Sequence, residues 1–157
     1  MKQKVYIETS VISYLTARIS RDLIVAGHQR LTQEWWTTRR DAFDVFVSQV
    51  VVEESSLGDP EAARQRLGVM QALPLLEISE AAVELAKELV RIGPLPPQAE
   101  VDALHIAVAV TGQVDYLLTW NCKHMANAAF RHRINTVCQD QGYVPIIICT
   151  PEELLED

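Results

Sequence analysis

The sequence predicts an α/β protein with three layers, in which helices cover both faces of a central parallel sheet. Short apolar runs alternate with longer segments in which apolar residues recur at helical spacing. Such alternation is typical of strand–helix–strand units, whose right-handed crossovers place helices on the sheet faces. The 157 residues suit one domain with its own core, and no repeat or low-complexity segment divides them. We therefore expect a single domain over residues 1–157.

Five strands are expected from short apolar or β-branched runs that polar and turn residues bound. The first opens with VYI, and the second runs directly into a helix. The fourth contains three apolar or aromatic residues in a row, as a strand buried on both faces does. The strands lie within residues 4–10, 43–52, 74–78, 114–118 and 144–149.

Helices are expected between these strands, and a polar cap residue precedes most of them. Asp59 before Pro60 is the clearest start, because aspartate caps a helix and proline suits its first position. Thr150 and Glu153 have the spacing of a capping box, and Ser48 is expected to cap a helix over 49–55. The other expected helices cover residues 20–40, 79–89, 97–112, 123–132 and 152–155, the first two of them capped by Ser20 and Ser79.

Composition narrows the class of protein. The formal net charge is −7, whereas a nucleic-acid-binding domain is expected to be basic. The sum does not decide the matter, because acids gathered in a cation site contribute to the same total. Cys122, Cys138 and Cys149 lack paired spacing, so we expect reduced thiols in a cytoplasmic protein. No apolar run suits a signal peptide or a membrane span, so no membrane partner is expected.

Polar residues able to bind a metal stand where the expected strands end or helices begin. The carboxyl ends of parallel strands meet at one edge of a sheet, so these side chains are expected to converge. Oxygen ligands suit Mg²⁺ or Mn²⁺, which polarise a phosphodiester and lower the pKa of bound water. Each residue alone also has a structural explanation, as a solvated strand end, a favourable charge in a first helical turn or a turn residue. The residues are Glu8, Glu53 or Glu54, Asp102 and Asn121.

Four segments together resemble the PIN-domain ribonucleases, in the branch of VapC-type toxins from bacterial toxin–antitoxin pairs. They are VYIETSVISYL, SQVVVEES, DALHIA and LLTWNCKH, which follow the family's order through nearly the whole chain. DALHIA is the most specific of the four. The resemblance implies a PIN-like fold, an endoribonuclease that uses Mg²⁺ or Mn²⁺ to hydrolyse RNA, a cognate antitoxin and a homodimer.

The resemblance also assigns roles to individual residues. It selects Glu54 over Glu53, because the family's acid stands six positions after a serine. It implies that four residues are catalytic and bind the metal, and that two hydroxyls orient the ligands or the metal's water. These residues are Glu8, Glu54, Asp102 and Asn121, supported by Ser10 and Thr119.

Two departures from the family pattern affect the expected metal site. The first acid is usually aspartate, whereas Glu8 adds one methylene and reaches roughly 1.5 Å further. The fourth is also usually aspartate, and the amide of Asn121 brings an oxygen without a charge. Three carboxylates then remain, so we expect weakened metal binding and at most one tight Mn²⁺ in the RNA-free protein.

Three basic or aromatic side chains near these acids have open interpretations. His105 stands three residues after Asp102 and either orients that acid or is a satisfied histidine at the helix surface. Lys123 and Arg131 follow the proposed site and are expected to contact RNA phosphates, which would position RNA without reading its sequence. A solvated helix face is the alternative interpretation for both cations.

Two other functions compete with the nuclease. A catalytically weakened PIN-like module that binds RNA or protein would retain the fold, and Glu8 and Asn121 would mark its altered site. A phosphatase of the haloacid-dehalogenase pattern requires an aspartate nucleophile after the first strand and a second aspartate two residues later. Glu8 and Ser10 occupy those positions and argue against it. Metal-dependent RNA cleavage discriminates the nuclease from the binding module.

Overall fold

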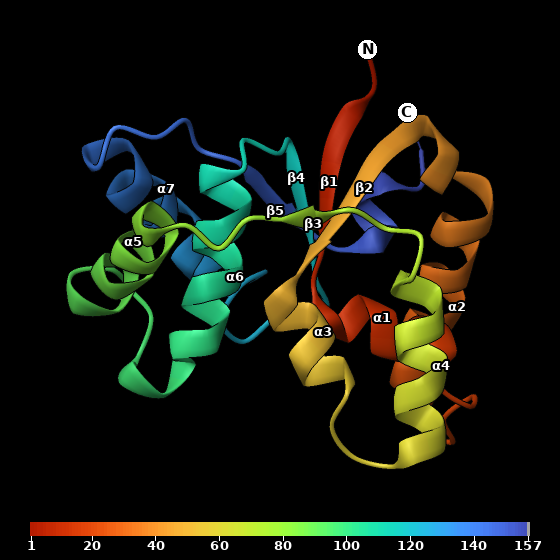
Figure 1. The fold of residues 1–157 in the computed structure, drawn as a ribbon. Coiled ribbons are helices and arrows are strands. Elements are labelled where there is room, and N and C mark those ends of the chain that lie inside the picture. Colours follow the sequence, from red (N-terminus) through yellow and green to blue (C-terminus); the bar gives the residue numbers. More distant parts are fainter. Residues whose placement is uncertain (157) are drawn as a thin grey trace.

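A five-stranded parallel sheet forms the centre of the computed structural model, which describes residues 1–156 (Figure 1). The spatial order of the strands is β3-β2-β1-β4-β5, so β1 is central. Residue 157, the end of the predicted domain, lies outside the described residues. The strands are β1 (Gln3–Ile7), β2 (Phe43–Ser48), β3 (Leu75–Leu76), β4 (Tyr116–Leu118) and β5 (Ile147–Cys149).

Helices cover both faces of this sheet. Figure 1 shows α5, α6 and α7 grouped on one side of the strands, and α1, α2 and α4 on the other. The three-layer α/β/α architecture predicted from the sequence is therefore confirmed. The helices are α1 (Thr9–Thr16), α2 (Leu23–Thr38), α3 (Gln49–Ser55), α4 (Pro60–Met70), α5 (Glu80–Arg91), α6 (Glu100–Thr111) and α7 (Ala128–Asp140), with 3₁₀ turns at Arg40–Ala42, Pro97–Ala99 and Pro151–Leu154.

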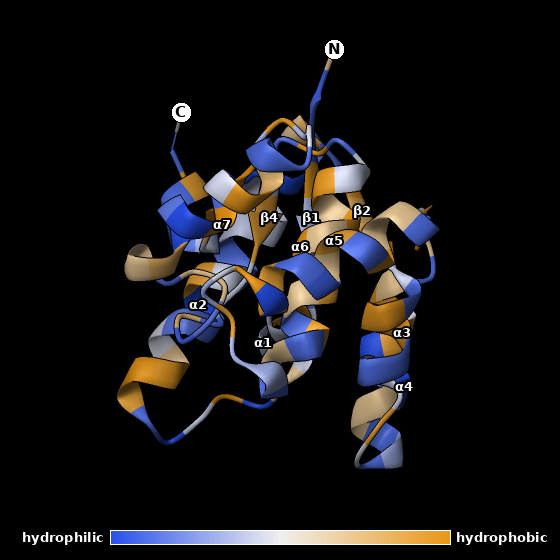
Figure 2. Cartoon of the chain, turned by 90° about the vertical axis from the view of Figure 1, so that its left-hand side faces the viewer, coloured by the Kyte–Doolittle hydropathy of each residue, from blue (hydrophilic) through white to orange (hydrophobic). Residues whose placement is uncertain are grey.

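The central strands form the core of the protein. Tyr6 and Ile7 of β1 and Leu117 and Leu118 of β4 are completely buried, and Figure 2 shows β2 and β4 in the hydrophobic colour. Such burial on both faces is expected when helices cover a parallel sheet. Helix α6 is also buried on nearly every side, which explains why its sequence is apolar almost throughout.

The register of the strands sets the position of the site. Ile7 pairs with Leu118, and Tyr6 pairs with Phe46 two residues before β2 ends. The chain therefore leaves β1, β2 and β4 at the same edge of the sheet. Residues 8–10, 49–55 and 119–124 follow there, which is the carboxyl edge where open α/β sheets bind ligands.

Several predicted caps are confirmed. The Asp59 side chain accepts from the backbone of Ala62 at the start of α4, and the Ser79 side chain accepts from Ala82 at the start of α5. Glu153 accepts from the backbone N–H of Thr150, as a capping box requires.

Two predictions about helix starts are wrong. Helix α2 begins at Leu23, with Asp22 as its cap, because the Asp22 carboxylate accepts from both Ile24 and Val25. Ser20 instead bonds the backbone of Asp22 outside the helix. A single hydroxyl satisfies fewer of the free N–H groups at a helix start than a carboxylate does.

The helix predicted over 123–132 is also wrong. Turns occupy residues 122–125, and α7 begins only at Ala128, after Asn127 has capped it. Asn121 explains the delay, because its side-chain oxygen accepts from the backbone N–H of His124 and holds a tight turn. Within residues 1–156 no helix combines the length and hydropathy that crossing a membrane requires.

Candidate metal centre

Glu8 lies at the carboxyl edge of the sheet, directly after β1, where it caps α1. Its carboxylate is buried and accepts three hydrogen bonds, from the backbone N–H of Ser10 at 3.1 Å, from Ser10 Oγ at 2.5 Å and from Thr119 Oγ1 at 2.6 Å. A buried carboxylate is costly unless such donors satisfy it. The two hydroxyls therefore hold Glu8 in one orientation.

The same two hydroxyls tie Glu8 to the loop after β4. Ser10 Oγ accepts from the backbone N–H of Trp120 at 2.8 Å, and Thr119 Oγ1 accepts from that of Asn121 at 2.9 Å. Each hydroxyl thus accepts from the loop and donates to the acid. The structure places both predicted supporting hydroxyls on Glu8.

Glu54 contributes a second carboxylate from α3. It lies near the last turn of this seven-residue helix, so interpreting it as a favourable first-turn charge is wrong. Its Oε1 atom accepts from Thr9 Oγ1 at 2.6 Å and pairs with His105 Nε2 at 2.6 Å. These specific partners, not the helix dipole, hold the side chain in place.

The pKa of Glu54 is lower than its ordinary value of 4.5. Partial burial raises this pKa, but the hydrogen bonds of His105 and Thr9 favour the ionised form and outweigh burial. Glu54 therefore presents a charged carboxylate at neutral pH, which a metal ligand requires.

His105 occupies neither of its two predicted positions. It is completely buried on α6, so it is not at the helix surface, and it contacts Glu54 instead of Asp102. Its other ring nitrogen, Nδ1, lies 2.7 Å from the hydroxyl of Tyr6. Residues three apart on a helix share a flank, but a ring directed at the sheet reaches residues of other elements.

Ser48 also has a role that differs from the predicted one. It stands at the start of α3, but its side chain makes no capping hydrogen bond. Its Oγ instead lies 2.8 Å from the hydroxyl of the buried Tyr6. A continuous chain of hydrogen bonds therefore runs from Ser48 through Tyr6 and His105 to Glu54.

Asp102 lies in the first turn of α6, one turn before His105. Its Oδ2 atom pairs with His124 Nδ1 at 2.8 Å, and both side chains are partly exposed. The positive end of the helix dipole stabilises an acid at this position. Asp102 is therefore tied to the turn after β4, which carries His124.

Asn121 and the two predicted RNA-binding cations lie beyond β4. Asn121 Oδ1 accepts from the backbone of His124, so the amide oxygen already has a partner. Lys123 is exposed on the following turn. Arg131 on α7 donates to the carbonyl of Ala126 and lies 3.8 Å from Glu153, which holds it toward the end of the chain.

The donor set fits a divalent cation. Ligand atoms of Glu8, Glu54 and His105 all lie within 4.8 Å of one another, the only such group of His, Cys, Asp and Glu found in residues 1–156. Asp102 lies one helical turn before His105 and is not part of this group. Two carboxylates fixed by hydroxyl and imidazole donors match the ligands and supporting hydrogen bonds of oxygen-rich metal sites.

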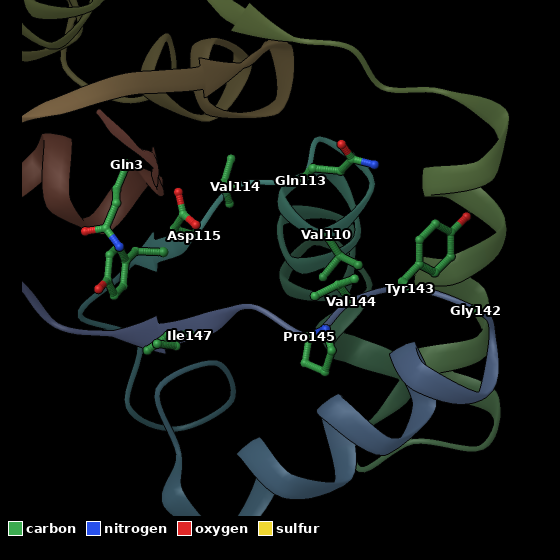
Figure 3. Close-up of a pocket in the computed structure, with 11 residues that line it drawn as sticks. Gln3, Val110, Gln113, Val114, Asp115, Gly142, Tyr143, Val144, Pro145 and Ile147 are labelled. Atoms are coloured by element: carbon green, nitrogen blue, oxygen red, sulfur yellow. The ribbon is translucent and has the colours of Figure 1, made fainter. Parts of the chain in front are cut away.

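A separate cavity of about 530 Å³ lies at the opposite, amino edge of the sheet (Figure 3). Its lining includes Gln3, Asp115 and Ile147, at or beside the start of their strands. Asp115 accepts from the backbone of Lys4 and is the only carboxylate among the lining residues. This cavity therefore offers no cluster of metal ligands.

The sequence interpretation did not predict the contacts that four residues make in and around the site. Tyr6 carried a signal, because a tyrosine in a strand buried on both faces needs a partner for its hydroxyl. Thr9, Ser48 and His124 carried none, since only the folded chain brings them to Glu54, Tyr6 and Asp102. These residues are Tyr6, Thr9, Ser48 and His124.

The sequence matches no family model and no curated protein. The structure is similar to VapC20 of Mycobacterium tuberculosis, a toxin that cleaves the sarcin–ricin loop. The TM-score is 0.60 at 14% identity, over 90% of this chain and 98% of that one. It is also similar to VapBC2 of Rickettsia felis, solved with a DNA fragment from its promoter. That TM-score is 0.51 at 15% identity, over 92% of this chain and 96% of that one. The chain therefore has the PIN-like α/β fold of these VapC structures, as its sequence predicts.

Proposed function

We propose that this protein is a metal-dependent endoribonuclease that hydrolyses RNA phosphodiester bonds. The observation that carries the proposal is the convergence of Glu8 and Glu54 at the carboxyl edge, where hydroxyl and imidazole groups hold both carboxylates. Fixed carboxylates that approach from different elements are the arrangement that a hard cation requires.

Glu8, Glu54 and Asp102 would hold Mg²⁺ or Mn²⁺, with Asn121 as the uncharged fourth member. A bound metal would polarise the phosphodiester and lower the pKa of a bound water. The protein's own contribution is orientation: Ser10 and Thr119 fix Glu8, and the lowered pKa of Glu54 keeps it charged.

RNA as the substrate is supported by the likeness to VapC20, which cleaves the sarcin–ricin loop. Lys123 is exposed beside the site and would contact RNA phosphates. Arg131 is held by Ala126 and Glu153, and its phosphate contact would require release from Glu153.

The likeness to VapBC2 supports a role as the toxin of a toxin–antitoxin pair, with a cognate antitoxin. The homodimeric state is proposed from the sequence resemblance alone. Co-expression with proteins encoded beside its gene would identify the antitoxin, and light scattering would give the mass of the free chain. An antitoxin should co-purify and suppress cleavage.

The decisive experiment is cleavage of a mixed single-stranded RNA by the purified protein with Mn²⁺, with Mg²⁺ and with chelator. Cleavage should require metal, and Asp102→Asn should reduce it by about 100-fold or more, because one of three ligand charges is lost. Glu100→Gln on the same helical turn is the matched control and should cleave like the unmodified protein.

Three outcomes would contradict this proposal or part of it. Cleavage that survives both chelator and Asp102→Asn would identify a contaminating ribonuclease. The absence of cleavage by folded protein free of any co-purified inhibitor would favour the alternative of a weakened binding module. Hydrolysis of a small phosphomonoester in place of RNA would favour a phosphatase.

A further inference from the structure

We infer that Ser48, Tyr6 and His105 form a positioning chain that fixes the Glu54 carboxylate for metal binding. The inference rests on the proposed metal-dependent function and names residues that act through Glu54 without touching the metal. The chain is the run of hydrogen bonds Ser48 Oγ to Tyr6 Oη, Tyr6 Oη to His105 Nδ1 and His105 Nε2 to Glu54 Oε1, with lengths of 2.8, 2.7 and 2.6 Å.

Burial makes the positioning chain rigid. Ser48, Tyr6 and His105 are each completely buried and come from the end of β2, the carboxyl half of β1 and the middle of α6. Each polar side-chain atom of these three residues bonds another member of the positioning chain or Glu54. Because the three residues are buried, water does not compete for these hydrogen bonds. Buried hydrogen bonds of this kind fix side-chain geometry more firmly than exposed ones do.

The chain also has a defined direction. An ionised carboxylate only accepts, so His105 Nε2 donates to Glu54, and Nδ1 of a neutral ring must then accept from Tyr6. Tyr6 has a single hydrogen to donate, so Ser48 must donate to the tyrosine oxygen. Burial raises the pKa of Tyr6, so its hydroxyl keeps that hydrogen. These contacts hold a neutral His105 in the tautomer that points its N–H at Glu54.

The geometry at Glu54 shows why positioning is needed. Its side chain is 37% exposed at the end of a short helix, so packing alone does not immobilise it. Both of its partners, Thr9 and His105, bond the same atom, Oε1. Among residues 1–156, Oε2 has no hydrogen-bond partner, so one oxygen is anchored and the other is presented to a cation.

The first test compares Tyr6→Phe with Tyr116→Phe, which deletes the same atom from the neighbouring strand β4. Calorimetric titration with MnCl₂ should show about tenfold weaker binding in Tyr6→Phe, as loss of a group supporting a metal ligand does. Tyr116→Phe should bind Mn²⁺ like the unmodified protein. The Mn²⁺ concentration for half-maximal RNA cleavage should rise about tenfold in Tyr6→Phe, while the rate at saturating Mn²⁺ stays within about threefold.

A double variant separates positioning from a general loss of structure. Tyr6→Phe should weaken Mn²⁺ binding in the unmodified chain but add nothing in a Glu54→Gln background, because it acts through that acid. Ser48→Ala removes the hydroxyl at the end of the positioning chain farthest from Glu54, and it replaces Tyr6→Phe if that variant fails to fold. We expect Ser48→Ala to bind Mn²⁺ about threefold more weakly than the unmodified protein.

The outcomes distinguish this inference from the proposed function. If the unmodified protein binds Mn²⁺ and cleaves RNA, but folded Tyr6→Phe and Ser48→Ala bind Mn²⁺ equally tightly, the positioning inference is wrong and the nuclease stands. Additive effects of Tyr6→Phe and Glu54→Gln would also overturn it. If the unmodified protein neither binds Mn²⁺ nor cleaves RNA, the proposed function itself fails.

Discussion

Two histidine–carboxylate pairs border the candidate site, and they differ in how firmly the fold holds them. His105 is completely buried, and both of its ring nitrogens have protein partners, Glu54 and Tyr6. His124 is partly exposed on the turn after β4, and its Nδ1 pairs with Asp102. Within residues 1–156, its Nε2 has no hydrogen-bond partner.

The difference follows from the elements that carry each pair. Glu54 and His105 lie on helices that pack against the sheet, whereas His124 lies on a turn that the Asn121 side chain holds. Both carboxylates are partly exposed, so the contrast lies in the histidines: His105 is completely buried between two side-chain partners, whereas His124 is partly exposed and has one. We infer that the Glu54 half of the site is preset by folding, while the Asp102 half adjusts when metal and substrate bind.

The largest effect should come from removing each histidine in turn. His105→Ala removes one of the two hydrogen-bond partners of Tyr6 and of Glu54 and opens a cavity, so unfolding free energy should fall by about 2 to 4 kcal/mol. His124→Ala removes a partly exposed contact and should cost less than about 1 kcal/mol. Urea unfolding of both variants measures the contrast, and equal losses would show that burial does not separate the two pairs.

A charge added to the adjustable half should strengthen metal binding. Asn121→Asp restores a fourth acid while keeping an oxygen for the backbone of His124, so Mn²⁺ should bind about fivefold more tightly, on the order of 1 kcal/mol. Asn127→Asp, which adds the same charge at the cap of α7, is the matched control. Calorimetry should find one tight Mn²⁺ in the RNA-free, unmodified chain, and two equally tight sites would contradict the three-carboxylate site.

The lowered pKa of Glu54 predicts how the stability of the folded protein changes at acidic pH. A carboxyl group whose pKa is lower in the folded than in the unfolded state stabilises the protein above its unfolded pKa, near 4.5. That contribution is lost as pH falls through the folded value. Glu54→Gln should therefore flatten the fall in stability below pH 4.5, whereas Glu53→Gln on the same helix should not. Thermal unfolding at a series of acidic pH values provides the measurement, and identical curves would show that the Glu54 contacts do not contribute.

The smallest expected effect is a difference in thiol reactivity, which tests the exposure of the turn that carries His124. Cys122 is exposed on that turn, whereas Cys138 and Cys149 are buried. Burial raises the pKa of Cys138 to about 11 and that of Cys149 to about 12. A thiol reagent at neutral pH should label Cys122 rapidly and the other two only after unfolding. Cys122→Ser is the control, and rapid labelling of a second thiol would show that the β5 side opens in the native protein.

The order of residue types along the sequence was enough to predict much of this fold. Alternating apolar runs predicted the parallel sheet, and Asp59 and Ser79 were recognisable as caps because capping depends on neighbouring residues. Local spacing gave a wrong prediction at Ser48. Its position suggested a helix cap, but its hydroxyl bonds Tyr6, 42 residues away in sequence. Long-range partners of this kind leave no trace in local spacing.

The sequence by itself determined the α/β class, the main helices and strands, and the edge of the sheet where Glu8, Glu53 or Glu54, Asp102 and Asn121 were expected. Strand ends and helix starts are local features, and a parallel sheet places all of them at one edge. Only the tertiary structure decided which acid pairs with which histidine. His105 contacts Glu54, and His124 contacts Asp102. The direction of the buried His105 ring depends on where Tyr6 of β1 and Glu54 of α3 lie relative to α6, and neighbouring residues in sequence do not encode those positions.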